Sequence, residues 1–298
     1  MGKVSKRDIF DEKFLNRLKR LAMVAKRLSV GLNTGVRRSR RIGDGLEFAD
    51  HRDYTPGDDM RFVDWPYYAR MERLLLRLFH EHSESEVAIL LDVSGSMASD
   101  EQKYRFSLRA AAALAYVAMA GLDRVRIQPF AEVLSDCFQG GRSRANLPAA
   151  LDFLVNVSPG SRTQLLSCVK HFVNQSNRPD TVLIVSDLLD CNDELSDSLA
   201  LLRSRACDVT VMHVWTQNDA SPSDVGPLGL VSAETGETMN VDATEDLLAS
   251  YATAWETFIT GCQRCCLSRG AIYVGSPSKL GVEKLVLNTL RRAGVLSS

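Results

Sequence analysis

The most regular hydrophobic pattern in the chain is an apolar run at 87–91 that ends at Asp92. Apolar residues at every position are typical of a strand that helices cover on both faces. Residues 102–120 follow with apolar residues at helical spacing. A second apolar run, 181–186, ends at Asp187. The pattern therefore predicts two buried strands, each of which delivers an aspartate to its carboxyl end.

Further strand and helix patterns alternate along residues 87–298. We predict strands at 126–130, 133–138, 209–215 and 271–275, helices at 144–155, 194–205 and 246–267, a helix that begins at Thr163, and a small hairpin within 228–241. The short connection between 126–130 and 133–138 predicts an antiparallel pair at the sheet edge. The alternation predicts an α/β, Rossmann-like fold: a doubly wound, mostly parallel sheet with one antiparallel edge strand.

Residues 1–42 differ in charge from the rest, with thirteen Lys or Arg against three acids. An amphipathic helix with a basic face is predicted here from the spacing of Phe10, Phe14, Leu18, Leu21, Ala25 and Leu28. Packing against the protein's own body is our first expectation for this helix, and a membrane surface or an acidic partner are the alternatives. We expect no nucleic acid, since no binding motif is recognisable. The predicted parts are a basic helical segment, 1–42, a small N-terminal subdomain, 43–86, and an α/β domain, 87–298.

Composition adds limits on the class of protein. A length of 298 residues, 45% hydrophobic and 24% charged residues and a net charge of −1 are ordinary for a globular protein. Seven cysteines, an odd number, indicate reduced thiols. Cys262, Cys265 and Cys266 contain half of a zinc motif without a second pair nearby, so buried thiols are the preferred interpretation. No apolar run reaches the roughly 18–20 residues of a membrane span and no signal peptide is recognisable, so we expect a cytoplasmic protein.

Small polar residues gather where the predicted strands end. Asp92, Ser94 and Ser96 follow the first buried strand, Thr163 lies at a predicted helix start, and Asp187 follows the second strand. Because the carboxyl ends of parallel strands meet at one edge of a sheet, we expect these residues to lie close together. Carboxylates with neutral hydroxyls suit a hard divalent cation such as magnesium. The alternative is that the hydroxyl residues cap helices and that Asp187 belongs to a turn.

The set and order of these five residues resemble the metal-ion-dependent adhesion site (MIDAS) of the von Willebrand factor A domain. The resemblance implies that Ser94 and Ser96 bind the ion directly, and Thr163 directly or through water. It implies that Asp92 and Asp187 hold the ion's waters or bind it directly, depending on the state. The implied ion is magnesium, or another divalent cation such as manganese or calcium. Its open position would accept a carboxylate from a partner.

A second, denser motif occupies residues 43–70, and its members are Glu47-Phe48, Arg52, Tyr54, Pro56 to Asp59, Arg61, Asp64-Trp65 and Ala69-Arg70. With the metal-site residues, it resembles a bacterial domain-of-unknown-function family of A-domain proteins that are typically encoded beside MoxR-type AAA+ ATPases. The chain departs from that family at Tyr67-Tyr68 and at Arg162. Internal ion pairing and a surface that contacts the ATPase are alternative roles for Asp58, Asp59, Arg61 and Arg70.

Together these patterns lead us to expect a non-enzymatic, magnesium-dependent protein-binding module. By the resemblance, it would be the adaptor of a MoxR-type ATPase in chaperone-like maturation or metal insertion of a client, which supplies an acidic side chain to the metal. The alternative is an aspartate-based, magnesium-dependent phosphatase with Asp92 as nucleophile. Such enzymes place a general acid two residues later, where this chain has Ser94.

Overall fold

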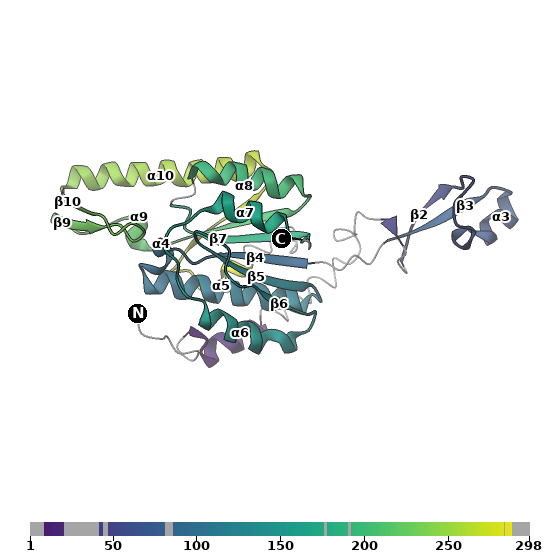
Figure 1. Cartoon of the computed structure of the whole chain (residues 1–298), viewed down its shortest axis with the longest axis horizontal. Helices are drawn as coiled ribbons and strands as arrows, with labels where there is room; N and C mark the ends of the chain where they lie inside the picture. The colour runs from purple at the N-terminus through teal and green to yellow at the C-terminus, as the bar shows by residue number, and fades with distance from the viewer. Residues whose placement is uncertain are drawn as a thin grey trace. The chain divides into compact units, whose positions relative to one another are not determined.

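The structure, a computed structural model, describes residues 9–20, 42–43, 47–80, 86–175, 178–189, 192–282 and 284–287. The chain divides into a large unit, residues 1–30 and 85–298, and a small unit, residues 31–84 (Figure 1). The large unit contains the predicted α/β pattern, and the small unit contains the dense charged motif.

A six-stranded sheet forms the centre of the large unit, in the order β11-β8-β7-β4-β5-β6. Its strands are β4 (Glu86–Asp92), β5 (Arg124–Phe130), β6 (Phe138–Gly140), β7 (Thr181–Ser186), β8 (Asp208–Trp215) and β11 (Ile272–Pro277). All neighbours pair in parallel except β6, which is antiparallel to β5. The prediction of a mostly parallel sheet with one antiparallel edge strand is therefore confirmed.

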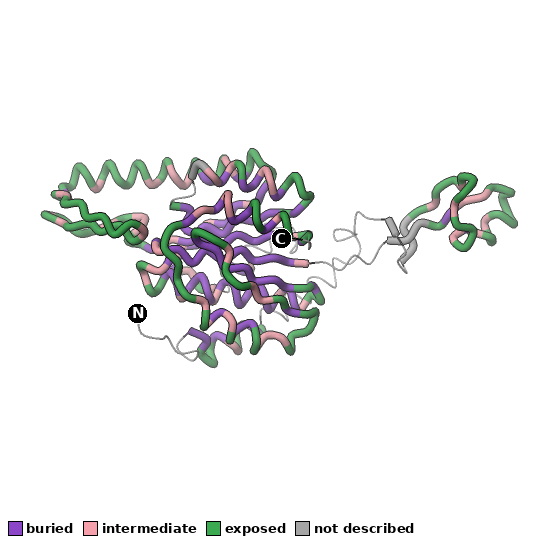
Figure 2. The backbone as a smooth tube through the Cα atoms, viewed as in Figure 1, coloured by how far each residue is buried: buried purple, intermediate pink, exposed green. Residues whose placement is uncertain are grey.

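Helices cover both faces of this sheet (Figure 1). One face carries α5 (Glu101–Ala120) and α6 (Leu147–Asn156), and the other carries α7 (Leu165–Val173), α8 (Asn192–Ser204) and α10 (Glu245–Ser268). Alternate residues of β4 enter different cores: Ile89 and Leu91 pack with α5, whereas Ala88 and Leu90 pack with α7 and α8. This two-sided burial, visible in Figure 2, explains why the strand is apolar at every position.

The described part of the N-terminal segment packs on the large unit. Residues 12–20 are helical, and Phe10, Phe14 and Leu18 are buried in the core that α5 shares. The guanidinium of Arg109, on α5, lies 5.6 Å from the centre of the Phe14 ring and donates a hydrogen bond to the Ile9 carbonyl. Packing on the protein's own body is thus observed for residues 9–20, while Leu21, Ala25 and Leu28 lie outside the described residues.

An insertion between β8 and α10 consists of α9 (Gln217–Ala220) and a two-stranded hairpin of β9 (Gly226–Val231) and β10 (Thr238–Ala243). The strands pair antiparallel from Gly226 with Ala243 to Val231 with Thr238. The predicted hairpin is confirmed. Most of its residues are exposed, because it pairs with no other strand among the described residues (Figure 2).

Three elements differ from the sequence prediction. The antiparallel edge strand is Phe138–Gly140 rather than 133–138, because Ser135 N donates to the Pro129 carbonyl at 3.0 Å and holds residues 131–137 in a loop. Helix α7 begins at Leu165 with Gln164 as its N-cap, so Thr163 lies in the preceding loop. The helix predicted at 144–155 is a short 3₁₀ turn, η2 (Arg144–Asn146), followed by α6.

The small unit is a three-stranded antiparallel sheet with one helix. Strand β3 (Leu75–His80) lies between β1 (Ile42–Gly43) and β2 (Glu47–Asp53) in the sheet. The connection from β2 to β3 contains the 3₁₀ turn η1 (Met60–Phe62) and α3 (Trp65–Met71). The Asp64 side chain caps α3 by accepting a hydrogen bond from Tyr67 N at 3.0 Å. Gly57 has φ of +106°, which the turn after Pro56 requires of glycine.

Candidate functional site

The first part of the site is the loop between β4 and α4 (Gly95–Ala98). Asp92 ends the strand, and its Oδ1 accepts a hydrogen bond from Ser94 N at 2.9 Å. Its Oδ2 accepts one from the Ser186 hydroxyl, at the end of the neighbouring strand β7, at 2.6 Å. All three residues are fully buried. The two central strands therefore fix the Asp92 carboxylate at the carboxyl edge of the sheet.

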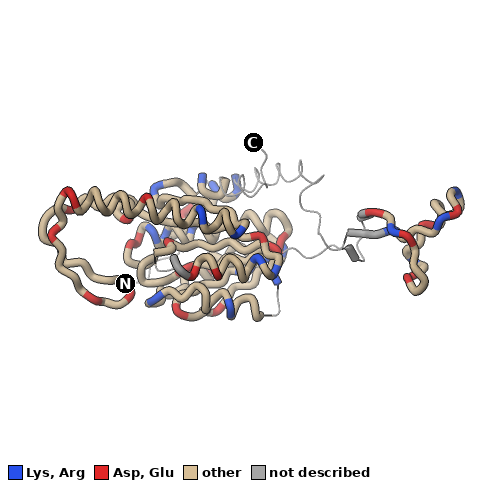
Figure 3. The backbone as a smooth tube through the Cα atoms, turned by 90° about the horizontal axis from the view of Figure 1, so that it is seen from above, with Lys and Arg blue, Asp and Glu red and all other residues tan. Residues whose placement is uncertain are grey.

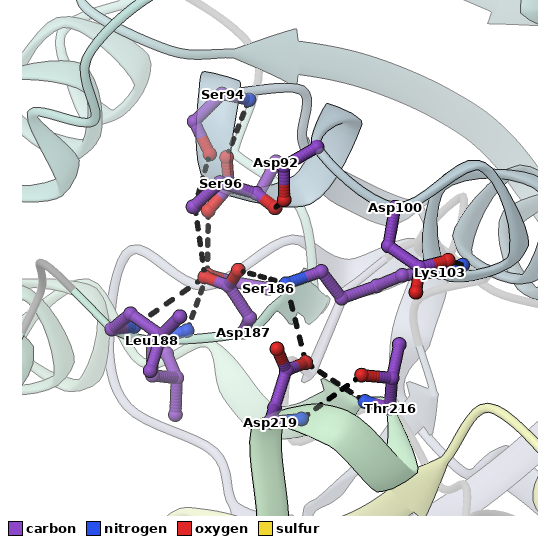
Figure 4. A network of polar contacts seen from close by, with 12 residues as sticks. Asp92, Ser94, Ser96, Asp100, Lys103, Ser186, Asp187, Leu188, Thr216 and Asp219 are labelled. Carbon is purple, nitrogen blue, oxygen red and sulfur yellow. Dashed lines mark hydrogen bonds and ion pairs between the residues drawn. The ribbon is translucent and has the colours of Figure 1, made fainter. Parts of the chain in front are cut away.

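Three of the other predicted residues converge beside Asp92 (Figure 4). The Ser94 and Ser96 hydroxyl oxygens lie 3.1 Å apart. The Ser96 hydroxyl donates to Oδ1 of Asp187 at 3.3 Å. Asp187 lies in the loop that follows β7. Ser94 is the N-cap residue of α4, but its side chain makes no capping hydrogen bond. Its hydroxyl is directed to the site, contrary to the alternative that it only caps a helix.

Thr163 lies in the adjacent loop, 158–164. Gly95 N donates to the Ser161 carbonyl at 2.7 Å, and Gly160 N donates to the Val93 carbonyl at 2.7 Å, so this loop is hydrogen-bonded to the β4–α4 loop. Thr163 is buried. Among the hydrogen bonds of the described residues, none joins its hydroxyl to the other four predicted residues. The structure thus brings four together directly and places the fifth on a loop bound to them.

The sequence analysis missed a buried cation in this site, Lys103 of α5. Its ammonium nitrogen lies 2.9 Å from Asp187 Oδ2 and 3.4 Å from Asp219 Oδ2. Asp219 belongs to α9, where its carboxylate accepts a hydrogen bond from Thr216 N at 2.8 Å in a capping box (Figure 4). Lys103 lies on the buried stripe of α5, four residues before the fully buried Ser107, but this burial is known only from the structure, and a lysine in a helix is usually solvated.

The charges of the site are unevenly compensated. Burial, followed by repulsion from Asp187, raises the pKa of Asp92 to about 7. Burial lowers the pKa of Lys103, but the carboxylates of Asp187 and Asp219 outweigh burial, so its pKa is raised and the ammonium stays charged. Lys103 thus compensates Asp187, whereas Asp92 has only neutral hydrogen-bond donors. A buried carboxylate in this position is stabilised by a further cation.

The donor set fits a hard divalent cation. Ser94 and Ser96 Oγ are 3.1 Å apart, which is close to the roughly 3 Å between adjacent ligands of an octahedral magnesium ion. Among the described residues, no cluster of three or more His, Cys, Asp or Glu side chains is arranged to hold a metal, so a cation here depends on the hydroxyls. Ser94, Ser96 and Thr163 would bind the ion, with Asp92 and Asp187 as the charged groups around it.

The thiols of α10 match the preferred interpretation of the cysteine cluster. Cys262 and Cys266 are fully buried in the core on that face of the sheet. Burial raises the pKa of Cys262 to about 11 and that of Cys266 to about 12. Thiols that stay protonated in apolar surroundings are typical of structural cysteines rather than of metal ligands.

Basic and acidic residues are interspersed along the backbone of the small unit (Figure 3), and several of their side chains form local pairs. Arg52 Nη2 lies 2.8 Å from Asp58 Oδ1, and hydrogen bonds from Arg52 and then Thr55 lower the pKa of Asp58 to about 2. Asp59 pairs with Arg61 at 2.6 Å, and both side chains are exposed. Arg70 Nε donates to the Pro66 carbonyl at 3.2 Å. Internal pairing is therefore present, and a contact with a partner stays a prediction.

Fold and site together define an α/β protein with a buried polar site at the carboxyl edge of a mostly parallel sheet. Residues 50–257 match the family described as "Protein of unknown function DUF58", and the chain belongs to this family. "Uncharacterized protein Mb1516" of Mycobacterium bovis and "Uncharacterized protein Rv1480" of Mycobacterium tuberculosis are similar to it. Each is 24% identical over 262 residues, which cover 83% of this chain and 79% of the relative.

Solved structures with a similar arrangement include BatB from Bacteroides thetaiotaomicron, at 15% identity and a TM-score of 0.40. An aerotolerance-related membrane protein from Bacteroides fragilis has 18% identity and a TM-score of 0.43. Both comparisons cover 70% of this chain and 99% of the other. An uncharacterized membrane spanning protein from Vibrio fischeri has 17% identity and a TM-score of 0.20, over 69% of this chain and 96% of the other.

The expectation of a cytoplasmic protein is contradicted by these comparisons, because two of the three solved structures are named as membrane proteins, and it is withdrawn. The expectation depended on the lack of an apolar run, a criterion that detects only segments that cross a bilayer. None of the described helices is long and apolar enough to do so.

Proposed function

We propose that this protein is a non-enzymatic, magnesium-dependent protein-binding module of the von Willebrand factor A type. The observation that carries the proposal is the convergence of Asp92, Ser94, Ser96 and Asp187 in one buried cluster, with hydroxyl oxygens at a separation suited to one ion. Thr163, on the adjoining loop, completes the set. An acidic side chain of a partner would bind at the ion's remaining position.

The partner we propose is a MoxR-type AAA+ ATPase, with the protein as its adaptor in maturation of, or metal insertion into, a client. The support for this is the motif at residues 43–70 together with the site residues. The exposed pair of Asp59 and Arg61 offers a charged surface on the small unit for the same partner. The two surfaces are separable by mutation.

One observation supports the phosphatase alternative, and two others oppose it. Lys103 supplies the cation beside the second aspartate that a phosphate-binding site needs. However, the Asp92 side chain is fully buried and each of its oxygens already accepts a hydrogen bond, so the described structure does not expose it to a substrate. Position 94 still lacks a general acid. The binding module accounts for more of the geometry.

Calorimetric titration of MgCl₂ into the full chain tests the proposal, with Asp92→Asn and Ser96→Ala as site variants and Asp197→Asn as the control. Asp197 is exposed on α8 and is not one of the clustered residues. We expect saturable binding in the wild type and the control, and none in the site variants. Capture of the ATPase should then require magnesium and be lost with chelator. Capture that is unchanged in chelator would refute the proposal.

A further inference from the structure

The tip of the β9–β10 hairpin has a conformation that its own sequence specifies. Ser232 N donates to the Glu237 carbonyl at 2.8 Å, and the Ser232 hydroxyl accepts from Thr235 N at 3.1 Å. Gly236 has φ of +71°, the left-handed conformation that favours glycine. These bonds hold residues 232–237 as a compact turn rather than a loose loop.

This tip rests on the candidate metal site. The Ala233 carbonyl oxygen lies only 2.4 Å from the position that a β-carbon would take at Gly95. Gly95 lies between Ser94 and Ser96, so it is part of the loop that carries both hydroxyls. A glycine there permits the backbone of the tip to approach the site more closely than any other residue would.

The next residue of the tip is an acid, Glu234. It is partly buried, and its Oε1 atom is shielded from solvent, whereas Glu237 on the same hairpin is exposed. The strands behind the tip are also exposed, including Leu230 at 47% and Met239 at 60%. A partly buried acid thus directly follows the residue that contacts the site loop, on a hairpin whose strands are mostly exposed.

The base of the same insertion is attached to the site as well. Asp219 of α9 lies 3.4 Å from Lys103 Nζ, and Lys103 contacts Asp187. The Tyr251 hydroxyl, on α10, donates to the Asp219 carbonyl at 2.7 Å. The tip therefore contacts the β4–α4 loop, and the base contacts Lys103. A cation bound in the site would act on both ends of the insertion.

We propose that the β9–β10 hairpin is a built-in cap of the metal site and that Glu234 is its acidic ligand group. This inference rests on the proposed function, because it concerns the same cation. Glu234 occupies the position that a partner's acid takes, and the partner binds by displacing the hairpin. The hairpin pairs with no other strand among the described residues, so its displacement leaves the six-stranded sheet intact.

Two measurements on the full chain test this proposal. One is hydrogen exchange of residues 226–243 with and without MgCl₂, and the other is calorimetric titration of the metal alone. The variants are Glu234→Gln and, as the matched control, Glu237→Gln. In the wild type and the control we expect magnesium to slow exchange of the hairpin amides. In Glu234→Gln this effect is lost and magnesium affinity falls roughly tenfold, because affinity follows the charge of the ligands.

Two results overturn the cap. If the wild type binds magnesium but Glu234→Gln keeps the same affinity and the same exchange, Glu234 is no ligand group and only this inference fails. If the wild type binds no magnesium, the proposed function fails, and the cap fails with it. The two failures are distinguished by the titration of the wild type.

Discussion

The ammonium nitrogen of Lys103 lies 2.9 Å from Asp187 Oδ2, and the two side chains are 1% and 3% exposed. This ion pair joins α5 to the loop after β7, inside the cluster of candidate metal ligands. Lys103 donates to Asp187 Oδ2. The other carboxylate oxygen, Oδ1, accepts from Ser96 and lies on the side of the hydroxyls. The pair therefore fixes which oxygen of Asp187 faces the candidate cation.

Replacement of Lys103 by Met should lower the free energy of unfolding by about 3–5 kcal/mol, because it leaves the buried Asp187 charge without its partner. Urea denaturation in chelator measures this. Arg105→Met is the control on the same helix, since its pair with Glu101 lies at the surface, and it should cost about 0.5 kcal/mol or less. Equal effects of the two substitutions would mean that the buried pair contributes no more than a surface pair.

Lys103 also shows where the sequence was insufficient. Strands β4 and β7 were predictable because apolar residues at every position have one common explanation, burial on both faces. Asp92, Ser94 and Ser96 are neighbours in sequence, and Asp187 follows from strand topology alone. A lysine in a helix is usually solvated, however, and its burial depends on Asp219, which belongs to an insertion distant in sequence. The position of β6 likewise depends on tertiary hydrogen bonds around Ser135.

The Asp92→Asn variant should be more stable than the wild type in chelator at pH 8. The folded-state pKa of Asp92, about 7, exceeds the ordinary 3.8, so its contribution to stability is present below pH 4 and is lost as the pH rises through 7. We expect a gain of about 1–3 kcal/mol for the variant at pH 8. Thermal unfolding in chelator at pH 5 and pH 8 measures it. A variant that is less stable than the wild type at pH 8 would contradict the raised pKa.

His213 should have the opposite pH dependence. Burial lowers its pKa to about 4 from 6.5, so the folded state binds fewer protons and stability is lost as the pH falls from 6.5 toward 4. Between pH 7 and pH 5 the loss should be about 1–2 kcal/mol in the wild type relative to His213→Gln. Trp215, with its ring 4.9 Å from the imidazole, reports unfolding by fluorescence. His171→Gln, an exposed position, is the control and should keep the wild-type pH dependence.

Two adjacent acids of the small unit, Asp58 and Asp59, allow a role in folding to be distinguished from a role in partner binding. Asp58 is bonded to Arg52 and to the backbone and hydroxyl of Thr55, so Asp58→Ala should lower the melting temperature of the small unit. Among the described residues, the Asp59 side chain makes hydrogen bonds only to the exposed Arg61, at its backbone N and its guanidinium, so Asp59→Lys should leave the sheet of the small unit folded. Loss of ATPase capture in a folded Asp59→Lys variant would support the contact surface. Capture at wild-type strength would assign these charges to structure alone.

Gly95→Ala tests the contact between the hairpin and the site without a change of charge. Alanine is preferred over glycine in a helix by up to about 1 kcal/mol, so α4 alone would gain from the substitution. The new β-carbon would lie 2.4 Å from the Ala233 carbonyl oxygen and 3.0 Å from that of Ser161, so the tip must move away. We therefore expect faster amide exchange at residues 226–243 by mass spectrometry. Gly261→Ala in α10, where a β-carbon meets open space, is the control and should leave the hairpin unchanged. Unchanged exchange in Gly95→Ala would mean that the tip does not rest on the β4–α4 loop in solution.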